Sequence, residues 1–413
     1  MQKRIALLIA LVVMATTLGG CGYLPAALLS DMLYSASPEP APVIEGESVT
    51  ISKEEYEKYK QFDTLLELMD LVEYGYYEEY AVQDMLDGAA NGLLLGLGDP
   101  YTFYYTPEEY AELWEDDEGE YAGVGIQIST SYLTGLCTIS RVFDNGPARE
   151  AGVLKGDILY KVEDLYVNSS TVDEAVDIMR GTPGTKVHVV FLRGTEEIAF
   201  DLVRANITVN RIDSGMLTDD VGYIYLYEFA GSCAADFEAA VKKLQNQGAE
   251  ALIIDLRDNP GGWVEDAEKI GDIFLDEGTL CYLQYNDGTR EYYKTKAGKL
   301  NMPLVVLMNE HSASSSEILA GALKDRADAT IVGVQSYGKG IVQTVVALED
   351  GAGMQMTIAQ YYTPNGNAVH KLGITPNVEI KLSAGDNGMY EFGDLTDPQL
   401  AKALEIIQQK MKK

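Results

Sequence analysis

The stretch PLVVLMNEHSASSSEILAGALKD, residues 303–325, decides the fold that this sequence predicts. Residues 304–308 are an uninterrupted apolar run, which is typical of a strand buried on both faces of a sheet. A serine-rich helix start follows at Ser314, and the alternation of strands with helices indicates an α/β sheet with crossover connections. Ser314 therefore follows the carboxyl end of a buried strand, where α/β sheets place their functional sites.

The same alternation extends along the rest of the carboxyl-terminal half. Apolar runs predict strands, a helical period of apolar residues predicts helices, and Asn286-Asp287-Gly288 predicts a hairpin turn. The expected strands cover residues 222–229, 251–257, 330–334 and 354–363, the expected helices cover 235–247 and 264–275, and the hairpin covers 281–295.

Two further regions precede this sheet. Apolar residues recur with helical spacing between residues 53 and 98, so we expect two amphipathic helices that form a cap or a dimerisation arm. Residues 120–207 alternate instead as short strands, with short helices expected near residues 146–153 and 172–179. The fold class is therefore multidomain α/β, with helical, β-rich and α/β regions in that order.

Lys339 is the only charged residue between Ala329 and Leu348. A lysine in so apolar a stretch either reaches solvent or gives up its proton, and a neutral lysine can deprotonate a serine. To act as a base at neutral pH, its pKa has to fall from about 10.4 to about 7–8, and burial can supply a change of that size. The pair Ser314 and Lys339 therefore points to a hydrolase.

The serine has a structural alternative. Ser314 and Glu317 have the spacing of a capping box, in which the serine only terminates a helix. A helix start at that place also aims backbone N–H groups at a developing anion. Residues 255–262, DLRDNPGG, run from a strand into a glycine turn whose N–H groups could serve the same purpose, or could only form a tight turn.

Composition excludes some classes of partner. The formal net charge of −33 over 413 residues argues against nucleic acids and anionic lipid surfaces. A basic start followed by apolar residues 5–17 has the pattern of an export signal, and this run is short for a membrane span. Small residues before Cys21 resemble a bacterial lipobox, so we expect lipidation of Cys21. Ordinary signal cleavage and an uncleaved anchor are the alternatives.

Cysteines and histidines predict no metal site. Cys137, Cys233 and Cys281 are far apart, form no CxxC pair, and are expected to be buried free thiols. The histidines are scattered, and only His311 is near Ser314 in the sequence. His311 just upstream of a helix start has poor geometry for a base, so Lys339 is preferred. No metal and no cofactor are expected.

Several segments together resemble the C-terminal processing, or tail-specific, serine peptidases. The segments are DLRDNPGG at residues 255–262, SASSSEILAGALKD at 312–325, SYGKGIVQ at 336–343, and the downstream residues 361–380. The β-rich region resembles a circularly permuted PDZ domain of the bacterial type, through GVGI at 123–126, GPA at 146–148, GDIL at 156–159 and Arg180-Gly181. The resemblance covers the chain from about Glu54 onward.

This resemblance implies roles for particular residues. Ser314 would be the nucleophile, Lys339 the general base, and Gln343 the residue that orients the lysine. The N–H of Ser315, with that of Gly261 or Gly262, would form the oxyanion hole. The family commonly has alanine where Ser315 stands, but the donor is a backbone group, so activity should survive the difference.

The PDZ domain would bind the substrate tail. Its groove adds a peptide as an extra strand and holds the terminal carboxylate with the N–H groups of Val124, Gly125 and Ile126. A bulge or a tight strand entry explains these glycines equally well. In the family the PDZ domain also gates the active site, and Arg180 is a candidate for that coupling.

The expected domains follow from these regions. They are a signal peptide at 1–20, a lipid-anchored linker at 21–50, a helical region at 51–106, a PDZ domain at 118–206, a peptidase core of the tail-specific protease/crotonase-like type at 107–117 and 207–385, and a carboxyl-terminal helical region at 386–413 that packs on the core or on the N-terminal helices.

The resulting hypothesis is an exported bacterial serine endopeptidase that cleaves proteins near free, apolar C-termini. It would be anchored by lipid to the outer face of the cytoplasmic membrane, or else be signal-anchored, periplasmic or secreted, and it could dimerise through its N-terminal helices. The competing hypotheses are a non-catalytic ligand- or peptide-binding lipoprotein with the same fold, as in interphotoreceptor retinoid-binding proteins, and a PDZ scaffold for envelope proteins.

Overall fold

The structure is a computed structural model that describes residues 50–118, 120–130, 134–296, 300–383 and 390–412. The predicted signal peptide, Cys21 and residues 22–49 of the predicted linker lie outside these ranges. The chain forms two compact units. Of the described residues, the first unit contains those up to Tyr110 together with Gln343–Thr357, and the second unit contains those within Ala111–Val342 and from Ile358 onward.

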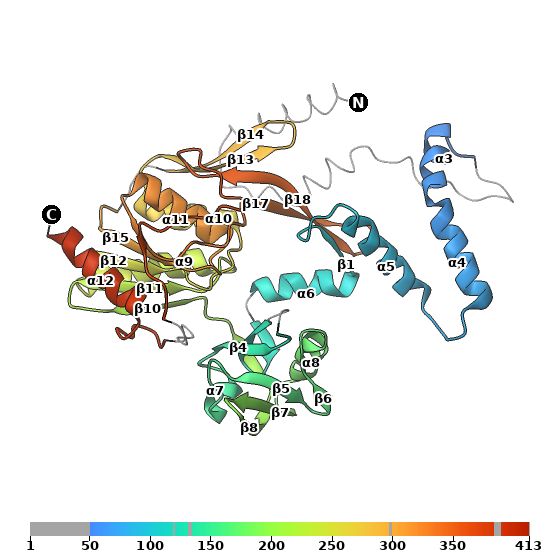
Figure 1. Ribbon diagram of the computed structural model, residues 1–413, viewed down its shortest axis with the longest axis horizontal. Coiled ribbons are helices and arrows are strands. Elements are labelled where there is room, and N and C mark those ends of the chain that lie inside the picture. The colour runs from blue at the N-terminus through green and yellow to red at the C-terminus, as the bar shows by residue number, and fades with distance from the viewer. Residues whose placement is uncertain (1–49, 119, 131–133, 297–299, 384–389, 413) are drawn as a thin grey trace. The chain divides into compact units, whose positions relative to one another are not determined.

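The first unit begins with helices. α3 (Lys53–Tyr59), the 3-10 helix η1 (Lys60–Phe62) and α4 (Asp63–Gly75) follow one another directly, and α5 (Val82–Leu95) comes next (Figure 1). The two helices expected between residues 53 and 98 are therefore present, with an additional short helix ahead of them. Among the described residues, no helix has both the length and the apolar composition that a membrane span requires.

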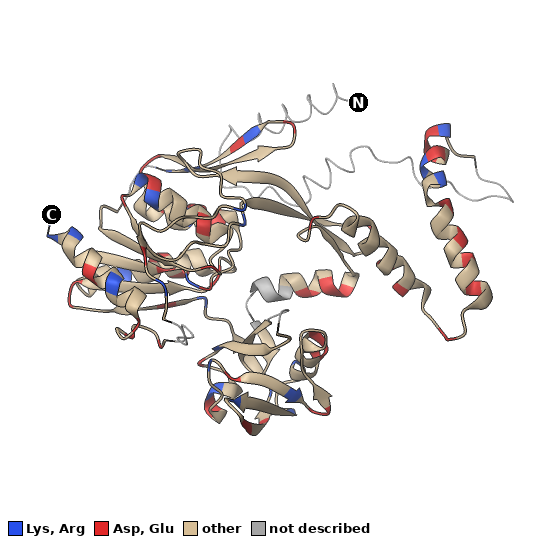
Figure 2. Cartoon of the chain, viewed as in Figure 1, with Lys and Arg blue, Asp and Glu red and all other residues tan. Residues whose placement is uncertain are grey.

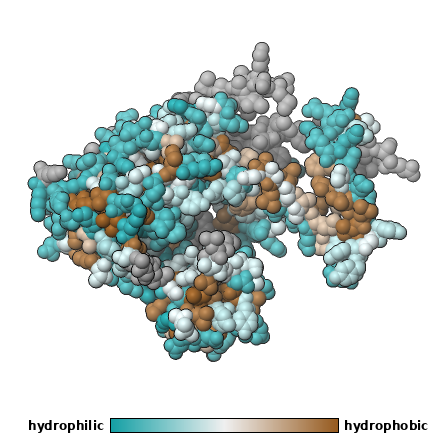
Figure 3. Space-filling model, viewed as in Figure 1, coloured by the Kyte–Doolittle hydropathy of each residue, from teal (hydrophilic) through white to brown (hydrophobic). Residues whose placement is uncertain are grey.

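The helices of the first unit leave their apolar side chains exposed. No residue of α3, α4 or α5 is buried, and apolar atoms gather on the surface over α4 and α5 (Figure 3). α4 carries acidic side chains and no basic ones (Figure 2). Apolar side chains that gather on the surface of helices in this way are typical of a site that another molecule covers.

Three strands connect distant parts of the sequence in this unit. β1 (Phe103–Tyr105) pairs antiparallel with β18 (Gly353–Tyr362), and β17 (Ile341–Ala347) also pairs with β18. The Oγ of Thr102 accepts the N–H of Thr357 at 3.0 Å. Both β17 and β18 run from one compact unit into the other.

The predicted PDZ region forms an antiparallel sheet in the second unit. Its strand order is β3–β4–β5–β7–β8, with β6 beside β5. The strands are β3 (Ile126–Thr130), β4 (Cys137–Val142), β5 (Ile158–Val162), β6 (Leu165–Tyr166), β7 (Lys186–Arg193) and β8 (Glu196–Val203), and the helices are α7 (Pro147–Ala151) and α8 (Val172–Met179). These elements confirm the β-rich region with two short helices, and the inward residues of its strands and helices form a separate core.

Two short elements and one helix border this region. α6 (Pro107–Glu118) precedes it, and β2 (Glu120–Gly123) pairs antiparallel with β9 (Ala205–Thr208) at its two ends. The entry to the PDZ region and the exit from it therefore run side by side.

The predicted peptidase core is built on a second sheet in the order β10–β11–β12–β15–β16–β19. β10 is antiparallel to β11, and the remaining pairs are parallel. The strands are β10 (Ile212–Met216), β11 (Val221–Leu226), β12 (Ala251–Asp255), β15 (Leu304–Met308), β16 (Thr330–Gly333) and β19 (Val378–Glu379). Every residue of β12 and β15 is buried, as expected for central parallel strands that are covered on both faces.

Helices cover the two faces of this sheet. α9 (Cys233–Asn246), α10 (Val264–Phe274) and α11 (Ser315–Arg326) pack on one face, and α12 (Pro398–Met411) packs on the other. A hairpin of β13 (Gly278–Tyr285) and β14 (Arg290–Thr295), which pairs with the end of β18, extends the first of these cores. The α/β sheet predicted from the apolar runs is therefore confirmed.

A buried ion pair network attaches α12 to the sheet. Arg257, just after β12, lies 2.6 Å from a carboxylate oxygen of Asp255 and 2.6 Å from one of Asp397. Asp397 also accepts the N–H of Gln399 at 2.8 Å and so caps α12. The carboxyl-terminal helix thus packs on the core, one of the two positions that the sequence left open.

Candidate active site

Ser314 lies in a sharp turn between β15 and α11. Its backbone has φ 54° and ψ −119°, which is a strained conformation for a residue with a side chain. A serine that only caps a helix has an extended backbone with negative φ. A strained strand-to-helix turn that presents a hydroxyl is instead the arrangement of catalytic serines on α/β sheets.

The capping interaction is nevertheless present. Ser314 and Glu317 form a capping box, in which the Ser314 N–H donates to Glu317 Oε2 at 3.0 Å. The N–H of Glu317 lies 2.8 Å from the carbonyl oxygen of Ser314. The capping arrangement is therefore present at this residue, but capping does not explain why its backbone is strained.

The carboxylate of Glu317 connects Ser314 to the segment of Lys339. Glu317 is fully buried, and its Oε2 accepts the N–H of Ser314 at 3.0 Å and that of Lys339 at 2.9 Å. Its Oε1 accepts the N–H of Gly338 at 2.7 Å and the hydroxyl of Ser336 at 2.5 Å. One carboxylate thus holds the backbone of the serine turn and the backbone of the lysine loop.

The surroundings of Glu317 suit an ionised carboxylate. Burial outweighs these hydrogen bonds and raises the pKa of the Glu317 carboxyl group above its ordinary value, while the donors of Ser336, Gly338, Ser314 and Lys339 oppose that rise. All of these groups donate hydrogen bonds to the carboxylate, and the hydroxyl of Tyr361 is an additional donor, 3.3 Å from Oε2. A carboxylate accepts at both oxygens, so the ionised form satisfies these donors.

The lysine loop is also held from its other side. The Lys371 N–H donates to the Gly338 carbonyl at 2.8 Å, and the Tyr361 N–H donates to that of Gly340 at 3.1 Å. A Cβ on Gly340 would lie 2.0 Å from the backbone nitrogen of His370, so only glycine fits there. Lys339 is half-buried in this loop.

The glycine turn at Gly261 and Gly262 packs directly against Ser314. A Cβ on Gly261 would lie 2.6 Å from the Ser314 Cβ and 2.9 Å from the Ser315 nitrogen. A Cβ on Gly262 would lie 2.0 Å from the carbonyl oxygen of Phe229. Both glycines also have positive φ, 105° and 134°, so space and backbone conformation each require glycine.

Hydrogen bonds distinguish the two glycine N–H groups. The Gly261 N–H donates to Asn259 Oδ1 at 2.8 Å, whereas the Gly261 carbonyl accepts the Phe229 N–H at 2.8 Å. Since C=O and N–H point in opposite directions in a trans peptide, the Gly262 N–H points away from Phe229. Among the described residues, neither the Gly262 N–H nor the Ser315 N–H donates to another protein group.

The remaining candidate residues are Gln343, His311 and Arg180. Gln343 is on β17, in the first unit, and its amide nitrogen lies 3.4 Å from Thr357 Oγ1. The side chain of His311 is exposed, before the serine turn. Arg180 ends α8, with its guanidinium 5.8 Å from the centre of the Tyr121 ring.

The predicted carboxylate-binding residues precede an open strand edge. Val124 and Gly125 separate β2 from β3. Gly125 has φ 82° and packs on Gly146. Ile126 is the first residue of β3, which pairs only with β4 among the described strands. Its outer edge is therefore available to an added strand.

Sequence reasoning missed three residues of this site. Glu317 was considered only as half of a capping box, and Asn259 and Phe229 were not considered at all. One signal was available for Glu317, because it is the only charged residue in SSSEILAGAL, residues 314–323, and the helix is buried there. Asn259 Oδ1 accepts the N–H of Gly261 two residues on, while its Nδ2 donates to the distant Leu226 carbonyl. Phe229 acts through hydrogen bonds to a segment distant in the sequence, which no local pattern reports.

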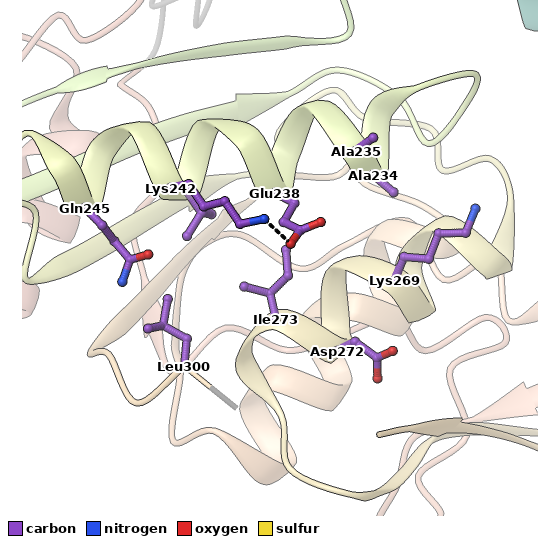
Figure 4. Close-up of a pocket in the computed structure, with 10 residues that line it drawn as sticks. Ala234, Ala235, Glu238, Lys242, Gln245, Lys269, Asp272, Ile273 and Leu300 are labelled. Carbon is purple, nitrogen blue, oxygen red and sulfur yellow. Dashed lines mark hydrogen bonds and ion pairs between the residues drawn. The ribbon is translucent and has the colours of Figure 1, made fainter. Parts of the chain in front are cut away.

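A separate groove lies between α9 and α10. Ala234, Glu238 and Lys242 of α9 face Lys269, Asp272 and Ile273 of α10 across it, and Glu238 pairs with Lys242 (Figure 4). None of the site residues above lines it. Among the described residues, no cluster of His, Cys, Asp and Glu has the arrangement of a metal site.

We expect Glu317→Gln to destabilise the peptidase core. An amide offers one acceptor oxygen and places an NH₂ group against N–H donors, so at least one buried donor loses its partner. The expected loss is about 2–4 kcal/mol in the free energy of unfolding, measured by denaturant titration. Glu310→Gln, an exposed residue on the same connection, is the control, and equal stability of the two variants would contradict the bridging role.

Comparisons with known proteins identify the family of the chain. The model of peptidase family S41 matches residues 220–380, and a PDZ domain model matches residues 138–193. The carboxy-terminal-processing protease of Bartonella bacilliformis is 33% identical over 354 residues, 82% of this chain and 79% of that protein. The carboxy-terminal processing protease CtpA of Bacillus subtilis is 33% identical over 325 residues, 78% of this chain and 69% of that one.

A solved structure shares the fold. The photosystem II D1 C-terminal processing protease superposes with a TM-score of 0.58 and 26% sequence identity, over 84% of this chain and 96% of that one. The expected combination of N-terminal helices, PDZ domain and α/β peptidase domain is thereby confirmed. The chain belongs to peptidase family S41 and is a carboxy-terminal processing serine protease with a PDZ domain.

Proposed function

We propose that this chain is an exported endopeptidase in which Ser314 is the nucleophile and Lys339 the general base. The observation that carries this proposal is the strained backbone of Ser314, together with the carboxylate of Glu317 that accepts the N–H of both Ser314 and Lys339. Strain at one residue that several contacts maintain is typical of a catalytic group. Gln343, four residues after Lys339, is proposed to orient the lysine amine.

The reaction would proceed through an acyl-enzyme. The neutral amine of Lys339 takes the proton of the Ser314 hydroxyl while the oxygen attacks the carbonyl carbon of the scissile peptide. The resulting oxyanion is stabilised by the N–H groups of Ser315 and Gly262, which are oriented for this role before the reaction begins. The lysine ammonium then gives its proton to the leaving amine, and water hydrolyses the ester by the same steps.

The two candidate glycines differ in support for the oxyanion role. The N–H of Gly261 is engaged by Asn259, whereas that of Gly262 is directed away from Phe229 and has no protein acceptor among the described residues. Gly262 is therefore the proposed second donor. Ser315 contributes a first-turn helix N–H, which has no acceptor within its own helix.

The PDZ domain is proposed to bind the substrate tail. The open edge of β3 would pair with the tail, and the N–H groups of Val124, Gly125 and Ile126 would hold its carboxylate. Partly buried Ile126, Val172 and Val176 border the PDZ core, which supports an apolar last residue. We further propose that tail binding gates cleavage, with Arg180 as a candidate for the coupling.

The location and assembly are proposed on separate grounds. The apolar run before Cys21 supports export and a lipid anchor on the outer face of the cytoplasmic membrane. The unburied apolar residues of α3, α4 and α5 support a homodimer in which these helices cover one another.

Ser314→Ala and Lys339→Ala should each lower kcat by about 10⁴-fold or more on a protein substrate with a free C-terminal tail. The first removes the nucleophile, and the second removes the base that takes its proton. Lys339→Arg should be equally inactive, because arginine keeps the charge but cannot serve as a base. Cleavage is measured by mass spectrometry of the products. Lys324→Ala, in an exposed contact to Thr375, should keep wild-type activity. Equal cleavage by wild type and the three site variants would refute the dyad.

Replacing Cys21 tests the anchor. Cys21→Ser should abolish incorporation of labelled palmitate and release the protein from the membrane fraction, since the serine hydroxyl cannot take the thioether-linked lipid. Labelling and fractionation of cells that express each form check this. Cys137→Ser, which changes a buried thiol, is the control. Retention of the label in Cys21→Ser would exclude lipidation at that residue.

Leu68→Glu combined with Leu71→Glu should halve the mass of the particle in solution. Both leucines are more than half exposed on α4, with 52% and 60% of their surface accessible, so charges there oppose helix association without disturbing a core. Light scattering after gel filtration measures the mass. Thr64→Glu, exposed on the same helix, should leave the dimer intact. A wild-type chain that is monomeric at all concentrations would disprove the dimer.

A further inference from the structure

Arg141 of the PDZ domain contacts the peptidase core through an aromatic ring. Its guanidinium carbon lies 3.4 Å from the centre of the Tyr227 ring and 4.8 Å from the centre of the Phe143 ring. Arg141 is on β4, and Tyr227 follows β11 of the core sheet. Burial between two rings lowers the pKa of Arg141, but a guanidinium stays protonated, so a cation–π contact joins the two domains.

Tyr227 is held firmly on its own side of this contact. Its hydroxyl donates to Asp213 Oδ2 at 2.6 Å, and its N–H donates to the Arg211 carbonyl at 2.9 Å. The Tyr227 ring also lies 4.4 Å from that of Tyr225. Asp213 adds an attraction for the guanidinium of Arg141. A displacement of Arg141 is therefore passed to the backbone of Tyr227 rather than absorbed by a mobile side chain.

The segment of Tyr227 leads directly to the proposed oxyanion donors. Two residues further on, the Phe229 N–H donates to the Gly261 carbonyl and the Phe229 carbonyl accepts the Trp263 N–H, both at 2.8 Å. These two bonds determine the orientation of the peptide that carries the Gly262 N–H. The position of Phe229 thus controls whether that N–H points toward the site.

The other end of the connection reaches the tail-binding strand. Arg141 on β4 lies opposite Gln127 on β3 in the antiparallel register. β3 is the strand whose outer edge would take up the substrate tail. A continuous series of contacts therefore runs from the tail through β3, β4, Arg141, Tyr227 and Phe229, and it ends at the Gly262 peptide.

We propose that Arg141 is the positioning residue through which an occupied PDZ groove acts on the oxyanion loop, by its contact with Tyr227. This inference rests on the proposed gating by the tail and names the residues that carry it. Arg180, the candidate named by the family resemblance, lies near Tyr121 on β2. The role of Arg141 is to transmit tail binding, so its loss should leave the affinity for the tail unchanged.

The first experiment compares kcat on two substrates that differ only in a free or amidated C-terminus. In the wild type, kcat on the substrate with the free carboxylate should be clearly higher than kcat on the amidated substrate, so that their ratio exceeds one. In Arg141→Leu this ratio should fall by about fivefold or more, toward one, which is the size of a typical coupling between sites. The dissociation constant of a tail peptide, measured by calorimetry, should not change.

Matched variants separate coupling from general damage. Tyr227→Phe loses the hydroxyl bond to Asp213 but keeps the ring and the backbone bond to Arg211, so it should keep most of the ratio. Tyr227→Leu removes the ring and should lower the ratio as Arg141→Leu does. Arg149→Leu removes another PDZ arginine, one that pairs with exposed Asp144, and should behave as wild type. If Arg141→Leu does not fold, the two Tyr227 variants make the same comparison.

The two tryptophans of the chain supply a readout that is independent of activity. Trp114 on α6 stacks on Trp263 with ring centres 6.1 Å apart and planes at 8°, and the Trp263 N–H is bound to Phe229. Addition of a saturating tail peptide should change the near-ultraviolet circular dichroism of this pair in the wild type. The same addition should have no effect in Arg141→Leu.

The outcomes distinguish this inference from the proposed function. A wild-type kcat ratio of one would overturn tail gating and this inference with it. A large wild-type ratio that Arg141→Leu and Tyr227→Leu both retain would overturn this inference alone. A loss of tail-peptide affinity in Arg141→Leu would assign Arg141 to the groove itself and would also overturn it.

Discussion

The site depends on one buried carboxylate. Glu317 accepts the backbone N–H groups of Ser314 and Lys339 at a single oxygen, so two segments far apart in the sequence are held at hydrogen-bond distance from the same atom. Removing a charge from water is costly unless donors replace the water, and here N–H and hydroxyl groups do so. Because those donors come from the serine turn and the lysine loop, the carboxylate is stable only when both are in place.

Backbone contacts without room for side chains complete this constraint. Gly261 and Gly262 bring a turn against Ser314, and Gly340 brings the lysine loop against His370. At each position a Cβ would overlap a neighbouring backbone or Cβ atom. The segments around Ser314 therefore meet through backbone groups, which have few ways to rearrange, and this rigidity maintains the strained conformation of the serine.

The proposed action of the PDZ domain would reach this rigid assembly at its edge. The proposed contact of Arg141 with Tyr227 reaches Phe229, which is bonded to the glycine turn on both sides of Gly262. Gating at that point requires only a small rotation of one peptide, since the two bonds of Phe229 determine where the Gly262 N–H points. The nucleophile and the lysine loop need not move.

The sequence alone determined the fold class and the family, and it made Ser314 and Lys339 candidates for the site, because periodicity, turn residues and motifs are local properties of the chain. It left open which glycine N–H is available, and it treated Glu317 only as a helix cap. Only the tertiary structure decided that Asn259 engages Gly261, that Glu317 joins Ser314 to Lys339, and that Arg141 meets Tyr227. The contacts of Glu317 and Arg141 depend on the packing of segments distant in the sequence, and partners at such distances leave no periodic pattern. The bond from Gly261 to Asn259 is local, but a glycine turn can form with either N–H engaged, so its motif does not say which one is.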